Sequence, residues 1–164
     1  MDNNRSPLGP SVLRLREAEP ADLAAVVDLD RRLTGTVKTA YWQTTLERHA
    51  GGPPEHCFLV AGDADASFVG FAIGEVRAWE FGSPPVGWVF AIQVDPDRRL
   101  VGAGTALFEG LCARFRAAGV DRVRTMVDRK DHLILSFFRS QGMMAGPSIE
   151  LEMTLDAAID GGAR

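Results

Sequence analysis

The chain is 164 residues long, with 46% hydrophobic residues, 24% charged residues and a formal net charge of −4. This composition is typical of a globular domain that buries its own core, and the excess of acids disfavours a general nucleic-acid binder. No apolar run approaches the ~18 residues of a membrane span, and residues 1–10 lack the apolar segment of a signal peptide. Cys57 and Cys112 lie far apart, without zinc-site spacing. We therefore expect a cytoplasmic protein with no metal, no nucleic-acid partner and no membrane partner.

The first third of the chain is predicted to hold a short strand and two helices. Residues 1–10 show no periodicity, which is typical of a flexible tail. After a strand over 12–16, Pro20 opens a helix in which apolar residues recur at helical spacing as far as Leu33. A second helix is predicted over 39–49, before a Gly-Gly-Pro-Pro break.

Beyond this break the apolar pattern becomes that of strands. Segments 57–61 and 67–77 are joined by a short turn rich in Gly and Asp, which predicts an antiparallel hairpin. A loop over 78–87 then leads into the run 88–94, which is almost continuously apolar. Such a run predicts a central strand that is buried on both faces.

The last part of the chain alternates between helices and strands. The predicted elements are a helix over 102–118, a strand over 123–127, a helix over 131–141 and a strand over 149–155. The final segment alternates apolar and charged residues, so it is predicted to be an antiparallel strand with one buried face. We expect one α/β domain over 11–156, with tails over 1–10 and 157–164.

Residues 94–105 carry the most chemical information. The buried strand runs through two arginines into a Gly-x-Gly pair and then into a helix. Gly102 and Gly104 have no Cβ, so a ligand can approach the backbone closely, and the first N–H groups of a helix suit a phosphate. A Rossmann motif is a weaker interpretation, because Leu107 stands at the third glycine position, and a P-loop would need a Gly-Lys-Ser/Thr that is absent.

The segment Arg99-Leu100-Val101-Gly102-Ala103-Gly104 resembles the Arg/Gln-x-x-Gly-x-Gly/Ala motif of the GCN5-related N-acetyltransferase (GNAT) family. Residues 92–96 resemble the central strand of that family, and residues 131–143 resemble its last helix. The resemblance covers about residues 12–155. It implies a mixed, mainly antiparallel sheet of about six or seven strands flanked by about four helices.

The same resemblance implies an enzyme that uses acetyl-CoA as acyl donor. The acetyl group would pass to a primary amine, on a small molecule or a peptide, by direct attack in a ternary complex. In this family the fourth and fifth strands part, and the pantetheine chain lies between them. Dimers are common in the family, so a homodimer is a further expectation.

The resemblance also assigns roles to residues on the coenzyme A side. The backbone of Ile92, Gln93 and Val94 would bind the pantetheine chain, and the Val94 N–H would face the thioester oxygen. The pyrophosphate would be held by Arg99, Leu100, Val101, Gly102, Ala103, Gly104 and Thr105. Asp131 replaces the family's asparagine, where it either contacts the cofactor or caps the helix.

Proton transfer departs from the family pattern at two places. Phe138 replaces the tyrosine that protonates the departing thiolate, so Ser136 or a water is the expected substitute. A glutamate early in the fourth strand is absent, and Glu75 is the leading candidate for the base. Glu75 shares a strand face with apolar residues, which is an unusual place for a carboxylate, although a solvated strand end near Arg77 explains it equally well.

The resemblance implies that the acceptor meets two variable segments, 34–54 and 78–87. Trp79, Glu80 and Phe81 are the candidate acceptor-binding residues, because aromatic residues in a loop are less easily explained as core. The missing tyrosine and the uncertain base leave a second function open. That alternative is a regulatory module on the same fold that binds acyl-CoA without catalysis.

Overall fold

The computed structural model describes residues 13–98 and 102–155. Contacts divide the chain into two compact units, one ending at Met126 and the other beginning at Val127. The predicted tails over 1–10 and 157–164 lie outside the described residues, and so do three motif residues, Arg99, Leu100 and Val101.

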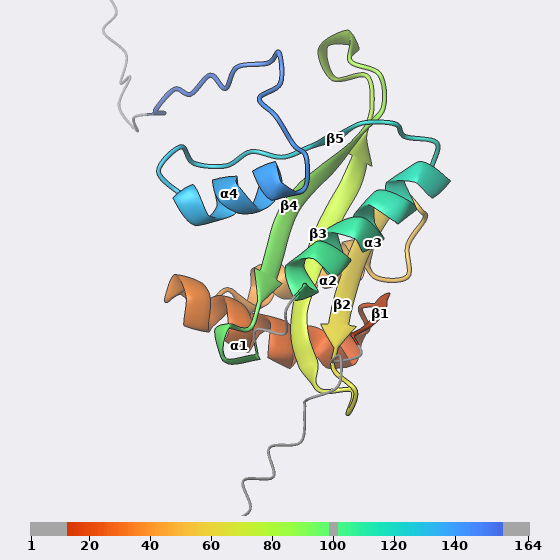
Figure 1. Ribbon diagram of the computed structural model, residues 1–164, viewed down its shortest axis with the longest axis vertical. Helices are drawn as coiled ribbons and strands as arrows, with labels where there is room; N and C mark the ends of the chain where they lie inside the picture. The colour runs from red at the N-terminus through yellow and green to blue at the C-terminus, as the bar shows by residue number, and fades with distance from the viewer. Residues whose placement is uncertain (1–12, 99–101, 156–164) are drawn as a thin grey trace, which may run out of the picture. The chain divides into compact units, whose positions relative to one another are not determined.

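The described strands of the first unit form one sheet of five strands in the order β1-β2-β3-β4-β5 (Figure 1). Their bounds are Arg14–Glu17 for β1, His56–Gly62 for β2, Phe68–Arg77 for β3, Val86–Val94 for β4 and Val123–Arg124 for β5. Neighbouring strands are antiparallel except β4 and β5, which are parallel. The predicted hairpin is confirmed, with Phe58 opposite Ile73 and Val60 opposite Phe71.

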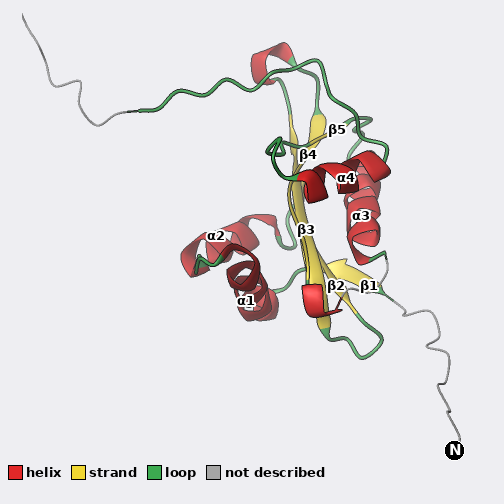
Figure 2. Cartoon of the chain, turned by 60° about the vertical axis from the view of Figure 1, so that its left-hand side comes forward, coloured by secondary structure: helices red, strands yellow, loops and turns green. Residues whose placement is uncertain are grey.

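Helices cover both faces of this sheet. Figure 2 shows α1 (Leu23–Thr34) and α2 (Thr39–His49) on one face and α3 (Ala103–Ala117) on the other. Short 3-10 turns occupy Pro20–Asp22, Glu80–Gly82 and Pro96–Arg98. The three helices agree with the predicted ranges, because each combines an apolar stripe with a recognisable start or stop residue.

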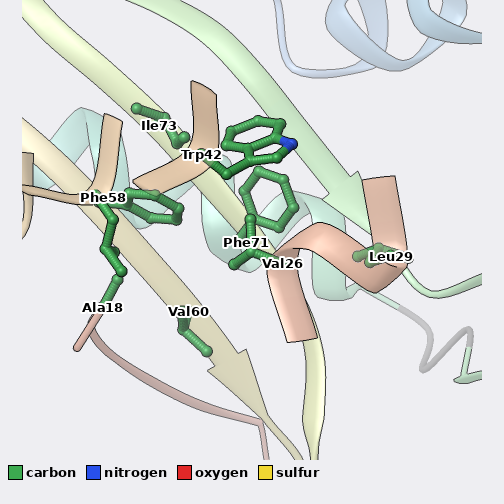
Figure 3. Packing of buried hydrophobic residues seen from close by; sticks show 9 residues of the cluster. Ala18, Val26, Leu29, Trp42, Phe58, Val60, Phe71 and Ile73 are labelled. Atoms are coloured by element: carbon green, nitrogen blue, oxygen red, sulfur yellow. The ribbon is translucent and has the colours of Figure 1, made fainter. Parts of the chain in front are cut away.

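The core on the α1 and α2 face is built around aromatic rings (Figure 3). Trp42 of α2 meets Phe71 of β3 edge to face, with ring centroids 5.2 Å apart, and Phe58 of β2 packs against the same ring. Val26 and Leu29 of α1 are also fully buried in this cluster. The cluster therefore fixes α2 against β3, beside the site described below.

The opposite face packs against α3 through a row of residues spaced four apart. Leu107, Leu111 and Phe115 are fully buried. A Cβ on Gly74 or Gly87 would overlap the Phe115 ring, so glycine at these two strand positions lets the helix approach the sheet.

The second unit contains α4 (His132–Ser140) and an extended segment. Asp131 caps α4, since its side chain accepts a hydrogen bond of 3.0 Å from the Ile134 N–H. The predicted strand over 149–155 is wrong, because no described strand forms a ladder with it. Its apolar residues are more than three-quarters exposed; they are Ile149, Leu151, Met153 and Leu155. Alternation shows which face a strand would bury, but a strand also needs a hydrogen-bonded neighbour.

Two further expectations need correction in the first unit. The predicted strand over 123–127 is only Val123–Arg124, so the described sheet has five strands rather than about six or seven. The run over 88–94 is also less buried than predicted, and Phe90 is 40% exposed. Phe90 lies at an irregularity of β4 and lines a cavity on the α2 side, which leaves its side chain partly open.

Candidate active site

The β5 side of β4 lacks a strand partner over most of its length. Within the described residues, the ladder between β4 and β5 pairs only Gly87 with Val123 and Trp88 with Arg124. The segment from Val89 to Val94 therefore continues without a ladder on that side. The two strands part where the family resemblance implies that they should.

The direction of the backbone groups along this edge follows from one hydrogen bond. The Asp95 N–H donates to the Val69 carbonyl at 2.8 Å, so at Asp95 the backbone faces β3. Successive residues of a strand direct their N–H groups to opposite sides. Ile92 and Val94 therefore direct theirs away from β3, toward the unpaired edge, whereas Gln93 directs its N–H toward β3.

A β-bulge interrupts β4 at Phe90. Ile73 lies opposite Ala91 and Gly74 lies opposite Val89, which leaves Phe90 as the extra residue. Bulges re-aim the side chain that they carry and often lie next to active sites. Here the Phe90 ring lies 5.5 Å from the His49 ring, centroid to centroid, on the α2 side of the sheet.

The helix that follows β4 begins at a left-handed glycine. Gly102 has φ of 91° and accepts the Ala106 N–H at 2.8 Å, but no side chain caps the helix there. The N–H groups of the first turn of α3, at Ala103 and Gly104, have no intrahelical acceptor. This end of α3 therefore offers backbone donors at the positive end of the helix dipole.

An ion pair secures the end of β4. Arg32 of α1 donates two hydrogen bonds to the Asp95 carboxylate, of 2.8 and 3.0 Å. These bonds hold the pKa of Asp95 below its usual value, despite its burial. Asp95 also accepts the Asp97 N–H, so the turn that leaves β4 is fixed on both sides.

A cavity of about 650 Å³ lies between α2 and the strands β3 and β4. Three elements that are remote in sequence line it. The lining residues are Ala40, Tyr41, Thr44, Thr45, Arg48 and His49 from α2, Glu75 and Arg77 from β3, and Phe90 from β4. This volume is within the range of small-molecule sites.

The carboxylate of Glu75 is the centre of the polar contacts in this cavity. Arg77 Nε donates to Oε1 at 2.8 Å, and His49 Nε2 lies 3.2 Å from Oε2. Burial alone would raise the pKa of Glu75, but the hydrogen bonds from Arg77 and His49 and the charges of Arg77 and Arg48 outweigh it and lower that pKa. Glu75 is therefore an ionised carboxylate at neutral pH.

His49 is held from both sides. Its Nδ1 lies 2.9 Å from the Thr45 carbonyl oxygen, which can only accept a hydrogen bond, and its Nε2 faces Glu75. The ring is almost fully buried. Both ring nitrogens therefore have protein partners, and this arrangement suits His49 to position the Glu75 carboxylate.

The buried carboxylate of Asp30 connects α1 with α2 and β4 through hydrogen bonds. Asp30 of α1 accepts hydrogen bonds from Trp42 Nε1 at 2.8 Å, Gln93 Nε2 at 2.9 Å and Lys38 Nζ at 3.1 Å. Burial would raise the pKa of Asp30, but these three bonds lower it overall. The side chain of Gln93 thus has a structural partner. Its backbone faces β3, so of the three residues expected to bind pantetheine only Ile92 and Val94 direct their backbone groups to the open edge.

The structure brings together only part of the predicted site. Glu75 lies on the α2 face with Phe71 and Ile73, as predicted, and lines the cavity. Trp79, Glu80 and Phe81 lie in an exposed turn, and none of them lines this cavity. Ser136 is exposed on α4 in the second unit, and its role as a proton donor remains a prediction.

The segment 34–54, expected to bind the acceptor, supplies most of the cavity lining, but sequence reasoning did not single out its residues. Arg48 and His49 end a predicted helix, and Tyr41, Thr44, Thr45 and Arg48 follow helical spacing along it. That polar stripe, together with Glu75 and Arg77 two residues apart on a strand, was the available signal. Nothing in the sequence shows that the stripe and the strand face each other.

Within the described residues, three other kinds of site have no support. No helix there is both long and apolar enough to cross a bilayer, and no group of three or more potential metal ligands is found. Burial raises the pKa of the Cys57 thiol to about 11 and also raises that of Cys112. Neither thiol is a nucleophile at neutral pH.

Comparisons with known proteins place this geometry in context. A mycothiol acetyltransferase of Thermobispora bispora is 31% identical over 140 residues, which are 81% of this chain and 47% of the relative. An L-2,4-diaminobutyric acid acetyltransferase of Nocardia farcinica is 28% identical over 100 residues, 61% of this chain and 50% of the relative. The chain thus spans about half the length of these two curated relatives.

Solved structures share the fold at low sequence identity. An aminoglycoside N-acetyltransferase in complex with CoA superposes with a TM-score of 0.76 and 17% identity, covering 91% of this chain and 98% of that one. Glucosamine-6-phosphate N-acetyltransferase from Arabidopsis thaliana gives a TM-score of 0.67 and 17% identity, covering 88% and 99%. The model of the acetyltransferase (GNAT) family matches residues 23–143, which include the open edge of β4, the start of α3 and the cavity. The chain belongs to the GNAT acetyltransferase family.

Proposed function

We propose that this protein is an N-acetyltransferase that moves the acetyl group of acetyl-CoA to a primary amine by direct attack in a ternary complex. The observation that carries this proposal is the position of the cavity, which reaches β4 at Phe90, in the stretch where β4 has lost its β5 partner. A donor bound along that edge and an acceptor bound in the cavity would meet at the same strand.

The donor side fits coenzyme A through backbone groups. The backbone groups of Ile92 and Val94 are directed toward the unpaired edge. The Ile92 N–H and the Val94 carbonyl would bind the pantetheine amides in place of a strand. Gly102, Ala103, Gly104 and Thr105 at the start of α3 would hold the pyrophosphate. Arg99, Leu100 and Val101 complete this segment in the proposal. Asp131 acts first as a helix cap, and we keep a cofactor contact as its second role.

When bound, acetyl-CoA supplies an acyl thioester. The Val94 N–H would donate to the thioester oxygen, and one such donor is typically worth about 3 kcal/mol of transition-state stabilisation. A thiol has a reference pKa of about 8.5, so the thiolate is a tolerable leaving group even though Phe138 replaces the family's tyrosine. Ser136 or a water would then return the proton.

The amine must lose a proton before it can attack. Within the described residues, Glu75 is the carboxylate that lines the cavity. Its lowered pKa makes it a weak base for direct abstraction, so we propose that it accepts the proton through a water. Each carboxylate oxygen has two lone pairs, and the bonds from Arg77 and His49 leave room for that water.

The relatives indicate small-molecule acceptors. One is named for L-2,4-diaminobutyric acid, and a similar solved structure holds the bisubstrate analogue CoA-S-monomethyl-acetylneamine. We therefore propose a small-molecule amine as acceptor, ahead of a peptide amine. A cytoplasmic location and a homodimer complete the proposal, and sedimentation of the purified protein tests the latter.

The proposed function is tested by two measurements on the full chain. Calorimetry with acetyl-CoA should show binding below millimolar concentration, and a panel of primary amines should release free CoA thiol with at least one member. Binding without release for every amine would favour the non-catalytic module. A protein that ignores acetyl-CoA at millimolar concentration would fall outside both functions.

A further inference from the structure

The charged residues that line the cavity indicate which kind of acceptor it would bind. This inference rests on the proposed function of the same site. Two arginines, Arg48 and Arg77, line the cavity against one carboxylate, Glu75. Both oxygens of that carboxylate already have partners in Arg77 and His49. The lining therefore presents an excess of positive charge to a ligand.

Arg48 has the free hydrogen-bonding capacity. Its contact with Glu75, from Nη2 to Oε2, is 3.9 Å long and so too long for a hydrogen bond. The side chain is 64% exposed, and within the described residues it has no hydrogen-bond acceptor. A guanidinium offers five donors in a planar fork that matches a carboxylate.

Arg77 is held in place beside it. Its Nε donates to Glu75, and its guanidinium carbon lies 5.0 Å from the centre of the Trp88 ring. Stacking on an aromatic face fixes the plane of a guanidinium while its terminal nitrogens stay available. Arg77 is 39% exposed, so these nitrogens are accessible to a ligand.

We propose that Arg48 and Arg77 recognise a carboxylate on the acceptor, so that the substrate is an amino acid or a similar amine with one acidic group. The excess of positive charge in the lining matches an acceptor that carries an acidic group. A polycationic amine would instead meet two guanidinium groups and a carboxylate that is already neutralised. The overall negative charge of the chain would suggest a cationic acceptor, but the local charge is what a bound ligand meets.

Matched pairs of acceptors test this inference. L-Lysine and 1,5-diaminopentane differ only by the carboxylate, as do L-ornithine and 1,4-diaminobutane. With wild-type protein and acetyl-CoA, kcat/KM from CoA release should be about 10-fold or more higher for the acid of at least one pair. Arg48→Gln should lower kcat/KM for that acid about 10- to 100-fold, mainly through KM, and bring the ratio of the pair close to one. The exposed Arg116→Gln variant on α3 is the control and should keep the wild-type ratio.

The outcomes separate this inference from the proposed function. If the diamine is turned over as well as or better than the acid in both pairs, the inferred carboxylate on the acceptor is wrong. The proposed acetyltransferase activity is then unaffected. Equal losses for acid and diamine in Arg48→Gln would lead to the same conclusion. If no amine is acetylated although acetyl-CoA binds, the proposed function fails. Calorimetric titration of wild type and Arg48→Gln with L-lysine and 1,5-diaminopentane then decides the inference alone: an Arg48-dependent preference for the acid supports it, and equal affinity overturns it.

Discussion

The two sides of β4 present different kinds of chemical group to a ligand. On the open edge and at the start of α3, the donors are backbone N–H groups and two glycines, Gly102 and Gly104. On the cavity side, the proposed functional groups are the side chains of Arg48, His49, Glu75 and Arg77, from two elements. A backbone site is damaged by added bulk or charge, whereas a side-chain site is damaged by deletion.

The largest effect is expected on the cavity side. Glu75→Gln keeps the size of the side chain but removes its charge, so kcat with the best acceptor should fall about 100-fold or more if the carboxylate accepts the proton. The Kd for acetyl-CoA should stay unchanged, because the donor side lies on the other edge of β4. Steady-state kinetics and calorimetry measure the two values.

Glu47→Gln is the matched control, since Glu47 is exposed on the same helix as His49. It should leave both kcat and Kd at the wild-type values. A folded Glu75→Gln variant with wild-type kcat would mean that Glu75 only organises the cavity.

The next largest effect is expected on the backbone side. Gly104→Glu places bulk and negative charge in the first turn of α3, so acetyl-CoA should bind about 100-fold more weakly. Ala113→Glu adds the same charge on an exposed position of the same helix and should not affect binding. If calorimetry shows that Gly104→Glu binds acetyl-CoA with unchanged affinity, the start of α3 does not bind the pyrophosphate.

The buried Asp30 joins the two sides, because it binds Trp42 of α2 and Gln93 of β4. Asp30→Asn should lower the free energy of unfolding by about 2 kcal/mol at pH 7, as measured in urea. The exposed Asp28→Asn on the same helix should change stability little. An equal effect of both variants would show that the buried contacts of Asp30 are not what stabilises the helices against β4.

Asp30 should also make the stability of the protein depend on pH. Its folded pKa lies below that of the unfolded chain, which is about 3.9. The contribution of Asp30 to the free energy of unfolding is therefore complete at higher pH and is lost as the pH falls through the folded pKa. Below about pH 4 the wild-type protein should lose more stability per pH step than Asp30→Asn. Parallel curves would contradict the assignment.

The smallest effect separates two glycines of one motif. Gly102 has φ of 91°, and a Cβ there would meet no atom within 4 Å, so Gly102→Ala should cost about 1 kcal/mol of stability through backbone strain alone. Gly104 lies inside α3, where alanine is the better helix former, so Gly104→Ala should not destabilise the fold. Urea unfolding of both variants gives the comparison.

Local pattern in the sequence was enough to predict most elements of this protein. The spacing of Leu107, Leu111 and Phe115 predicts α3, the alternation around the 62–66 turn predicts the β2–β3 hairpin, and the Gly-x-Gly pair predicts an anion site at a helix start. Each of these signals lies within one or two neighbouring elements, where chain geometry alone relates the residues. The family resemblance then ordered them into one fold.

Tertiary structure decided what local pattern cannot contain. The segment 149–155 alternates like a strand but lacks a described neighbour to pair with. Phe90 is exposed because it lies at a bulge of β4 and lines the cavity. The cavity joins Arg48 and His49 at the end of α2 to Glu75 and Arg77 on β3, and the aromatic core around Trp42 and Phe71 holds those elements together. A sequence states which side chains are present, whereas packing decides which of them lie close enough to act on one another's charge.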